Sequence, residues 1–180
     1  TAAISRHTNA FKINEDVVIP LPRMAEYTDG IERINIELSL RNKLKLCDAL
    51  TEFFERGNLP LGKHDADDEV PSPELLQDRV AQAIALVEEV RALWQGWLHD
   101  VETLFPQLQD HTLRASWKTQ LRAPLQGIFT GAAFKPILDE AVAIHKRVLK
   151  GRVWVALHMH AGDGNVHTNI PVNSDDYEML

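Results

Sequence analysis

Apolar residues recur at helical spacing along much of the chain, and they first predict a long helix over residues 23–56. The apolar positions follow one another mainly at steps of three and four from Ile31 to Phe54. Gly57 is a suitable C-terminal cap for this helix, and Gly30 is expected to bend or interrupt it near its start. The following segment, 58–73, is rich in proline and aspartate and predicts a loop.

A second, more regular apolar series predicts another long helix. Ser72 and Pro73 suit its first turn, and Pro106 is expected to stop it. The series alternates steps of four and three over about four heptads. Its members are Leu76, Val80, Ala83, Val87, Val90, Trp94, Trp97, Val101 and Leu104. The two helices are predicted to form an antiparallel hairpin, or an arm that pairs with a partner through Trp94 and Trp97 as core or interface anchors.

Short runs rich in β-branched residues predict strands near both ends of the chain. Residues 16–19 read DVVI and are followed by proline, and the segments 153–160 and 166–170 flank an Ala-Gly-Asp-Gly turn. Residues 134–150 predict a helix just before the second strand. This order of elements predicts an α+β fold: a small antiparallel sheet with packed helices and a large helical insertion.

The same pattern predicts how the chain is divided. Residues 1–57 would form the first part of the α+β domain, 58–131 the helical insertion, and 132–180 the second part with the Gly-Asp-Gly hairpin. The chain begins with threonine and ends as a polar segment starts, so we expect it to be a piece of a longer polypeptide.

Composition narrows the classes of function. The 180 residues carry a net charge of −7 and no cluster of Lys and Arg, which argues against nucleic acid as a partner. No apolar run has the length of a membrane span, so we expect none. Cys47 is the only cysteine, which excludes an internal disulfide and any multi-cysteine metal site in this chain. A reducing, cytoplasmic location fits this usage.

Three histidines surround the Gly-Asp-Gly turn: His158, His160 and His167. Side chains alternate along a strand, so His158 and His160 share a face, and the turn is expected to bring His167 toward His160. Two neutral imidazoles with an open position suit Zn²⁺ or Mn²⁺, and a carboxylate would be expected to complete such a site. Strand histidines are usually structural or exposed, so spacing alone leaves a structural role and a metal or catalytic role open.

Two other features carry weaker chemistry. The acidic run Asp65, Asp67, Asp68 and Glu69 predicts a solvated linker, and a carboxylate metal site there lacks supporting spacing. His145 lies on the apolar face of the predicted 134–150 helix and is expected to be a satisfied histidine at the edge of the core.

The segment from His160 to His167, HAGDGNVH, resembles the H-x-G-D-G-N-x-H motif of the C-terminal domain of FAD-linked oxidases. This family includes glycolate oxidase, D-lactate dehydrogenase and D-2-hydroxyglutarate dehydrogenase. The segments Asn9–Lys12 and Glu15–Pro20 resemble the stretch that leads into a core strand of the same domain. The middle of the chain does not match this domain and is similar to insertions in long bacterial FAD-linked dehydrogenases fused to an iron–sulfur region.

The resemblance implies a substrate- and metal-binding fragment of an FAD-dependent dehydrogenase. His160 and His167 would bind a divalent metal, Zn or Mn; Asn169 would contact a 2-hydroxy acid such as D-lactate or glycolate. Lys12, and more weakly Arg6, would pair with the substrate carboxylate. The metal would polarise the substrate hydroxyl, and hydride would pass to FAD.

The chain departs from the family pattern in two respects. A later Glu-His-Gly segment that supplies the third metal ligand is missing from these residues, and nothing in them resembles the FAD-binding domain, which would be a partner. We therefore expect no complete catalytic site and no activity of the chain alone. The alternative is a non-catalytic helical interaction module that forms a homo-oligomer through the insertion.

Overall fold

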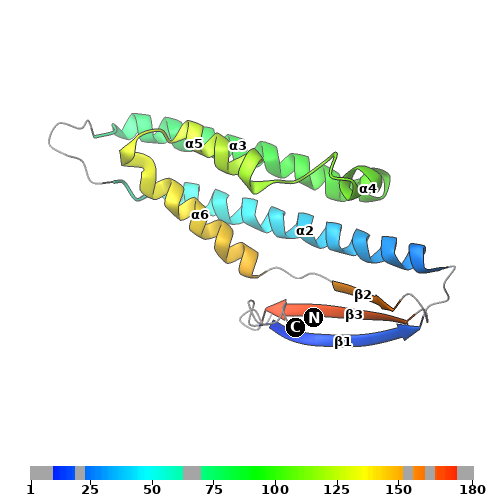
Figure 1. Cartoon of the computed structure of the whole chain (residues 1–180). Helices are drawn as coiled ribbons and strands as arrows, with labels where there is room; N and C mark the ends of the chain where they lie inside the picture. Colours follow the sequence, from blue (N-terminus) through cyan, green and yellow to red (C-terminus); the bar gives the residue numbers. More distant parts are fainter. Residues whose placement is uncertain (1–9, 19–22, 63–69, 152–155, 161–164, 174–180) are drawn as a thin grey trace. The chain divides into compact units, whose positions relative to one another are not determined.

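Helices supply the packed core of this protein. The computed structural model describes residues 10–18, 23–62, 70–151, 156–160 and 165–173 (Figure 1), with side chains over 23–62 and 70–151. Of the residues with described side chains, 82% are helical and none lies in a strand. The predicted α+β fold with a small antiparallel sheet is therefore wrong as a fold class, because the buried apolar residues belong to helices packing on helices: the protein is helical.

The chain divides into two compact units. The first comprises residues 1–42, 100–113 and 149–180, and the second comprises 43–99 and 114–148. These boundaries differ from the predicted division into 1–57, 58–131 and 132–180. The predicted ranges follow the resemblance to a family domain, whereas the two observed units are defined by compactness. The predicted division therefore stays a prediction.

Helix α2, Met24–Glu55, confirms the first long predicted helix. It passes through Gly30 without interruption, and Gly57 follows its end at a φ of +72°, as a C-terminal cap requires. The buried face is only partly the predicted one, because Ile34 is 45% exposed whereas Phe53 is buried. Packing against neighbouring helices, rather than spacing alone, decides which apolar positions are covered.

Helix α3, Pro73–His99, confirms the second predicted helix. The Ser72 hydroxyl accepts a hydrogen bond from the Leu75 backbone N–H at 3.1 Å, which is an N-terminal cap. The prediction that Pro106 stops this helix is wrong. The break occurs at Asp100, and Pro106 lies inside the next helix, α4, Val101–Gln109. Proline removes only one hydrogen-bond donor from a helix. Because the chain breaks at Asp100, before the proline, a new short helix can form that contains Pro106.

The segment before the last helix combines three short helical elements. A π-helical turn, η2, spans Lys118–Arg122 and continues directly into α5, Ala123–Ile128. A 3₁₀ turn, η3, spans Ala132–Phe134 and leads into α6, Lys135–Lys150, as the sequence predicted for this last helix. Pro124 lies in the first turn of α5, where its missing N–H costs the helix little.

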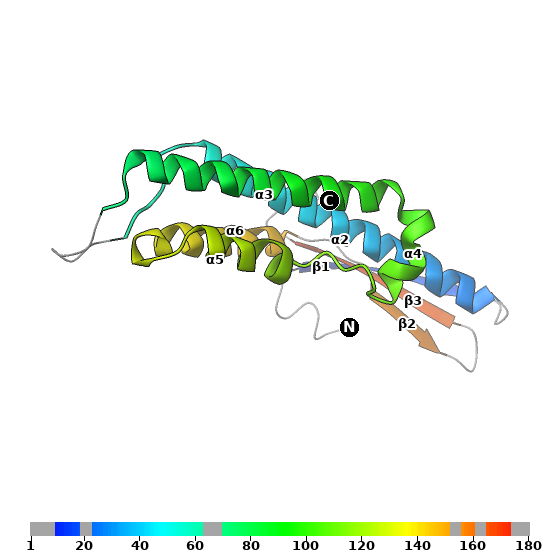
Figure 2. The ribbon, with the colours of Figure 1, turned by 90° about the horizontal axis from the view of Figure 1, so that it is seen from above.

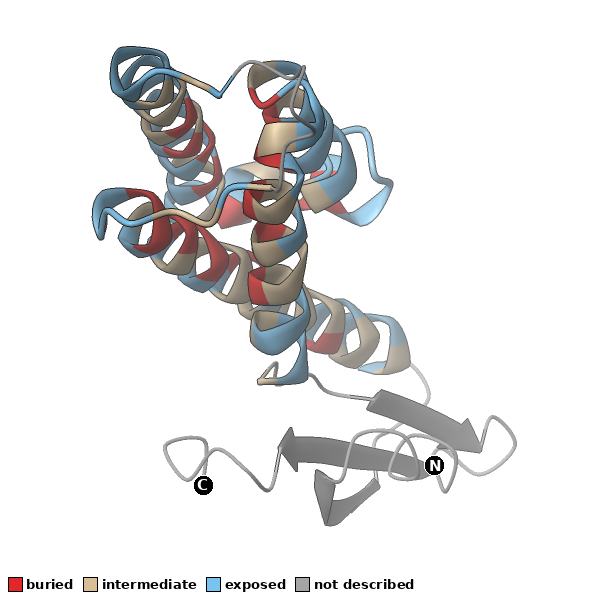
Figure 3. Ribbon diagram, turned by 90° about the vertical axis from the view of Figure 1, so that its left-hand side faces the viewer, coloured by how far each residue is buried: buried red, intermediate tan, exposed pale blue. Residues whose placement is uncertain are grey.

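The second unit contains a continuous aromatic and aliphatic core. Figure 2 shows α5 alongside α3, and the buried residues in Figure 3 line the inward faces of the helices. Phe54 stacks on Phe129 with ring centroids 5.8 Å apart, and Phe129 meets Phe134 edge-on at 5.6 Å. Burial of these rings stabilises this unit together with its buried aliphatic side chains and Trp94.

In the first unit, α4 and the start of α2 share polar and aromatic contacts. The Arg33 guanidinium lies 4.7 Å from the centre of the Phe105 ring and 3.8 Å from the Glu102 carboxylate. The Gln109 amide donates to Asp29 and Glu32 of α2. These contacts join two helix segments that are far apart in the sequence.

The ends of the chain carry three strands, β1 (Ala10–Val18), β2 (Ala156–His160) and β3 (Asn165–Asn173). Their backbones pair antiparallel in the order β1-β3-β2. β1 begins earlier than predicted, and β3 continues beyond Pro171. The predicted turn at 161–164 and the polar segment after residue 173 lie outside the described residues.

Candidate functional site

The histidine hairpin is organised by the register of its strands. β3 is the central strand, and His167 lies opposite Asp16 of β1 on one side and opposite His158 of β2 on the other. His160 pairs with Asn165, where the hairpin closes. The sequence predicted that His167 would approach His160. In the observed register His158 is directly opposite His167, and His160 lies one diagonal step away.

Strand alternation divides these residues into a polar and an apolar face. Residues opposite each other in the register share a face, as do every second residue along a strand. The polar face holds Lys12, Asn14, Asp16 and Val18 of β1, Asn165, His167 and Asn169 of β3, and Ala156, His158 and His160 of β2. The opposite face holds mainly Phe, Ile, Leu, Val and Met positions. We call the first set the polar face.

The candidate substrate residues fall on the same polar face. Asn169 lies opposite Asn14 and Ala156, one register step from the row of His167. Lys12 lies opposite Pro171, one further step away. Arg6 lies outside the described residues. The register thus brings four of the five predicted site residues to one side of three neighbouring strands, although Lys12 is about 150 positions from the other three in the sequence.

The described side chains, over 23–62 and 70–151, contain no group of three or more His, Cys, Asp or Glu residues that could hold a metal ion. The acidic run Asp65–Glu69 falls outside this part of the chain. His145 is described, and it stacks on Trp117 with ring centroids 4.7 Å apart and planes 8° apart. Burial lowers the pKa of His145, and the positive charge of Lys43 lowers it further. This ring pair matches the expected core-edge role.

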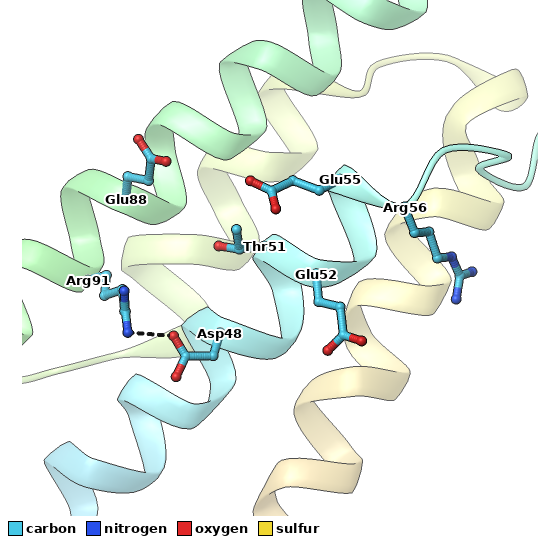
Figure 4. A pocket seen from close by; sticks show the side chains of 7 residues that line it. All are labelled: Asp48, Thr51, Glu52, Glu55, Arg56, Glu88 and Arg91. Carbon is cyan, nitrogen blue, oxygen red and sulfur yellow. Dashed lines mark ion pairs between the residues drawn. The ribbon is translucent and has the colours of Figure 1, made fainter.

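A groove between α2 and α3 in the second unit was missed by the sequence reasoning. It has a volume of about 420 Å³, and its lining residues are Asp48, Thr51, Glu52, Glu55, Arg56, Glu88 and Arg91. Figure 4 shows Arg91 of α3 reaching Asp48 of α2, with an N–O distance of 2.7 Å. The spacing of Asp48, Glu52 and Glu55 along one helical face is the only sequence signal for it.

The chemistry of this groove limits what it can bind. Four carboxylates and two guanidinium groups line it, so the diphosphate of a flavin dinucleotide would meet net negative charge there. Cys47 lies next to Asp48 but is fully buried, and desolvation raises its thiol pKa to about 12. The thiol therefore stays protonated and offers no nucleophile at neutral pH.

The heptad residues of α3 are used inside the second unit. Ala83, Val87, Val90 and Trp94 are buried, and the Trp94 indole N–H donates to the Gln120 side-chain oxygen at 3.2 Å. Trp94 thus anchors α3 to η2 of its own chain. Of the two residues predicted as core or interface anchors, Trp94 therefore belongs to the core.

No family model, curated protein or solved structure matches the chain. The residues that bear on function are therefore those of the motif and of the polar face. No helix in the described part of the chain is long and apolar enough to cross a membrane.

Proposed function

We propose that the chain supplies the substrate- and metal-binding corner of an FAD-dependent dehydrogenase of 2-hydroxy acids such as D-lactate or glycolate. The observation that carries the proposal is the complete H-x-G-D-G-N-x-H segment, whose histidines and following Asn169 share the polar face with Lys12. A cytoplasmic location belongs to the same proposal.

The residue types on the polar face suit a divalent metal. Neutral imidazoles are ligands that Zn²⁺ and Mn²⁺ accept, and His160 and His167 would provide two of them from neighbouring strands, with a carboxylate expected to complete the site. When bound, the metal would supply Lewis acidity that polarises the substrate hydroxyl. Asn169 would orient the substrate by hydrogen bonds, and the Lys12 ammonium would attract its carboxylate.

The described residues do not fit the flavin itself. The groove between α2 and α3 is lined by four carboxylates, which repel phosphate. The FAD would therefore be held by a separate domain, and this chain would act by presenting the hydroxy acid to it. The interaction-module alternative stays a prediction, and no described contact gives it additional support.

Turnover in the flavin-containing protein that carries this chain tests the proposal. His160→Ala and His167→Ala should each lower the rate with a 2-hydroxy acid by about 10-fold or more, because losing one metal-site residue typically has effects of this size. His99→Ala, at the exposed end of α3, is the matched control and should leave the rate unchanged. Unchanged turnover in both hairpin variants would overturn the proposal.

A further inference from the structure

Two half-buried rings from different helical elements lie face to face in the second unit. Trp117 directly precedes η2, and His145 lies in the second half of α6. Their ring centroids are 4.7 Å apart and their planes differ by 8°. Both side chains are only partly exposed, so this pair, which we call the ring stack, lies at the edge of the core. Water can reach an imidazole in such a place, and a histidine titrates near neutral pH.

The ring stack lies at the start of an unusual helical turn. η2 is a π turn, a rare conformation that is frequent at functional sites. The side-chain oxygen of Gln120 links the same turn to α3, because it accepts the Trp94 indole N–H at 3.2 Å. The turn is therefore tied to two neighbouring helices. The link to α3 contains no titratable group, whereas the link to α6 contains an imidazole.

The surroundings of His145 disfavour a positive charge on its ring. Burial lowers the pKa of His145, and the positive charge of Lys43 on α2 lowers it further. Glu140, the acid of α6 closest to His145 in sequence, is paired with Arg147 at 3.3 Å. The charge of this carboxylate is thus already compensated by another cation.

The charges on the other elements beside the ring stack do not offset this effect. Lys118 is the first residue of η2, Lys146 follows the histidine on α6, and both side chains are exposed. Asp48, the next acid along α2 from Lys43, is paired with Arg91 at 2.7 Å. A protonated imidazole would therefore have mainly positive neighbours. Attraction of an imidazolium for the indole face acts in the opposite direction.

We propose that the ring stack is an acid-sensitive contact, which holds the start of η2 on α6 while the imidazole is neutral and separates when the imidazole takes up a proton. A group that binds its proton more readily in the separated state is driven toward that state as the pH falls. The separation would be local, because the Gln120 link and the buried Trp94 do not titrate. This inference goes beyond the proposed function and does not depend on it.

The test is an NMR titration of the complete 180-residue chain, labelled on its tryptophan indole N–H groups. Trp117→Phe and Trp94→Phe identify the signals of the two residues. Between about pH 7.5 and about pH 5 the Trp117 signal should move with a midpoint below 6.5, the ordinary pKa of histidine, and the His145 ring should titrate with the same midpoint. The signal of Trp94 should not move.

Three variants assign the movement to the ring stack. His145→Phe keeps an aromatic ring that cannot take up a proton, and it should make the Trp117 signal independent of pH. Lys43→Gln removes a positive charge and should raise the midpoint. His99→Gln, at the exposed end of α3, is the matched control and should leave the midpoint unchanged.

The inference is overturned by a Trp117 signal that stays fixed while the His145 ring titrates, or by one that moves equally in His145→Phe. A midpoint above 6.5 would also overturn it, because the indole would then hold the imidazolium. If helical circular dichroism shows that acid unfolds the whole chain first, the comparison is made at about pH 7.5. There the indole N–H of Trp117 should exchange with water faster in His145→Gln, which lacks the ring, than in His145→Phe, and equal exchange would contradict the inference.

Discussion

Trp94 offers a quantitative test of how the helical core is held together. Its side chain has no exposed surface, and its indole N–H donates to Gln120 at 3.2 Å. The same Gln120 oxygen accepts the Ser116 backbone N–H at 2.6 Å, so one amide connects α3 to the start of the π turn. Replacing Trp94 therefore removes both apolar burial and a polar link.

The magnitude follows from these contacts. A buried tryptophan covers about 200 Å² of apolar surface, which at about 25 cal/mol per Å² corresponds to about 5 kcal/mol. Trp94→Ala is expected to lower the free energy of unfolding by about 3–5 kcal/mol. Trp94→Phe retains most of the ring but loses the donor, and it should cost about 1–2 kcal/mol.

The assay is urea unfolding followed by helical circular dichroism, with size-exclusion chromatography for the oligomeric state. Leu93→Ala is the control, since Leu93 is the preceding residue of α3 and is 44% exposed. It should change the free energy of unfolding by no more than about 0.5 kcal/mol. Equal effects of Trp94→Ala and Leu93→Ala would refute the packing account. Dissociation of an oligomer at unchanged stability would place Trp94 at an interface instead.

Three further predictions concern single residues of the second unit. Gly96→Ala should stabilise α3 by about 1 kcal/mol, because a Cβ at this position meets nothing within 4 Å. Gly62→Ala should instead lower the free energy of unfolding by about 1–3 kcal/mol, because its Cβ would lie 2.7 Å from the Ala132 carbonyl oxygen. Chemical denaturation measures both, and the same sign for the two variants would contradict this reasoning. Cys47 should resist a disulfide exchange reagent at mildly alkaline pH and react only after unfolding, because burial raises its pKa to about 12; rapid labelling of the folded chain would be inconsistent with that burial. His145 has a pKa lowered from 6.5 in the folded state, so the unfolded chain binds the proton more readily and stability should fall as pH drops below 6.5. The unfolding midpoint of the unaltered chain should be lower at about pH 5.5 than at about pH 7.5, and this difference should be smaller in His145→Gln. If His145→Gln shows the same pH dependence as the unaltered chain, His145 is not the group responsible.

The sequence predicted the long helices well because their signals are local. Apolar periodicity located both ends of α2 to within a few residues, and the Ser72 cap located the start of α3. The effect of Pro106 was mispredicted because the sequence does not show where packing allows the helix to break. The break lies at Asp100, before the proline. The exposed position of Ile34 shows the same limit, since helical spacing identifies candidates for burial but tertiary contacts select among them.

The fold class was misjudged for a related reason. Local sequence patterns predict strands and helices independently of one another, whereas the fold class depends on which of their apolar faces are buried against each other. Phe54 of α2, Phe129 just after α5 and Phe134 of η3 meet from separate parts of the chain, and no local pattern predicts that meeting. The described core is therefore helical, although short strands pair at the ends of the chain.

The candidate site was found in sequence through its histidines, but its arrangement was not. The pairing of His167 with His158 and Asp16 depends on where the hairpin closes and on a strand from the other end of the chain. A change of two residues in the register would exchange His158 for His160 opposite His167. Register is a property of the whole ladder, so spacing within one segment could not fix it.

The most direct test of the central claim is the visible absorption spectrum of the flavin-containing protein that carries this chain. It would be recorded without oxygen, before and after adding D-lactate. The account predicts an oxidised flavin band that bleaches on addition of the acid and persists in His167→Ala. A well-folded protein with no flavin band, or with a band that D-lactate, glycolate and D-2-hydroxyglutarate all leave unchanged, would contradict it.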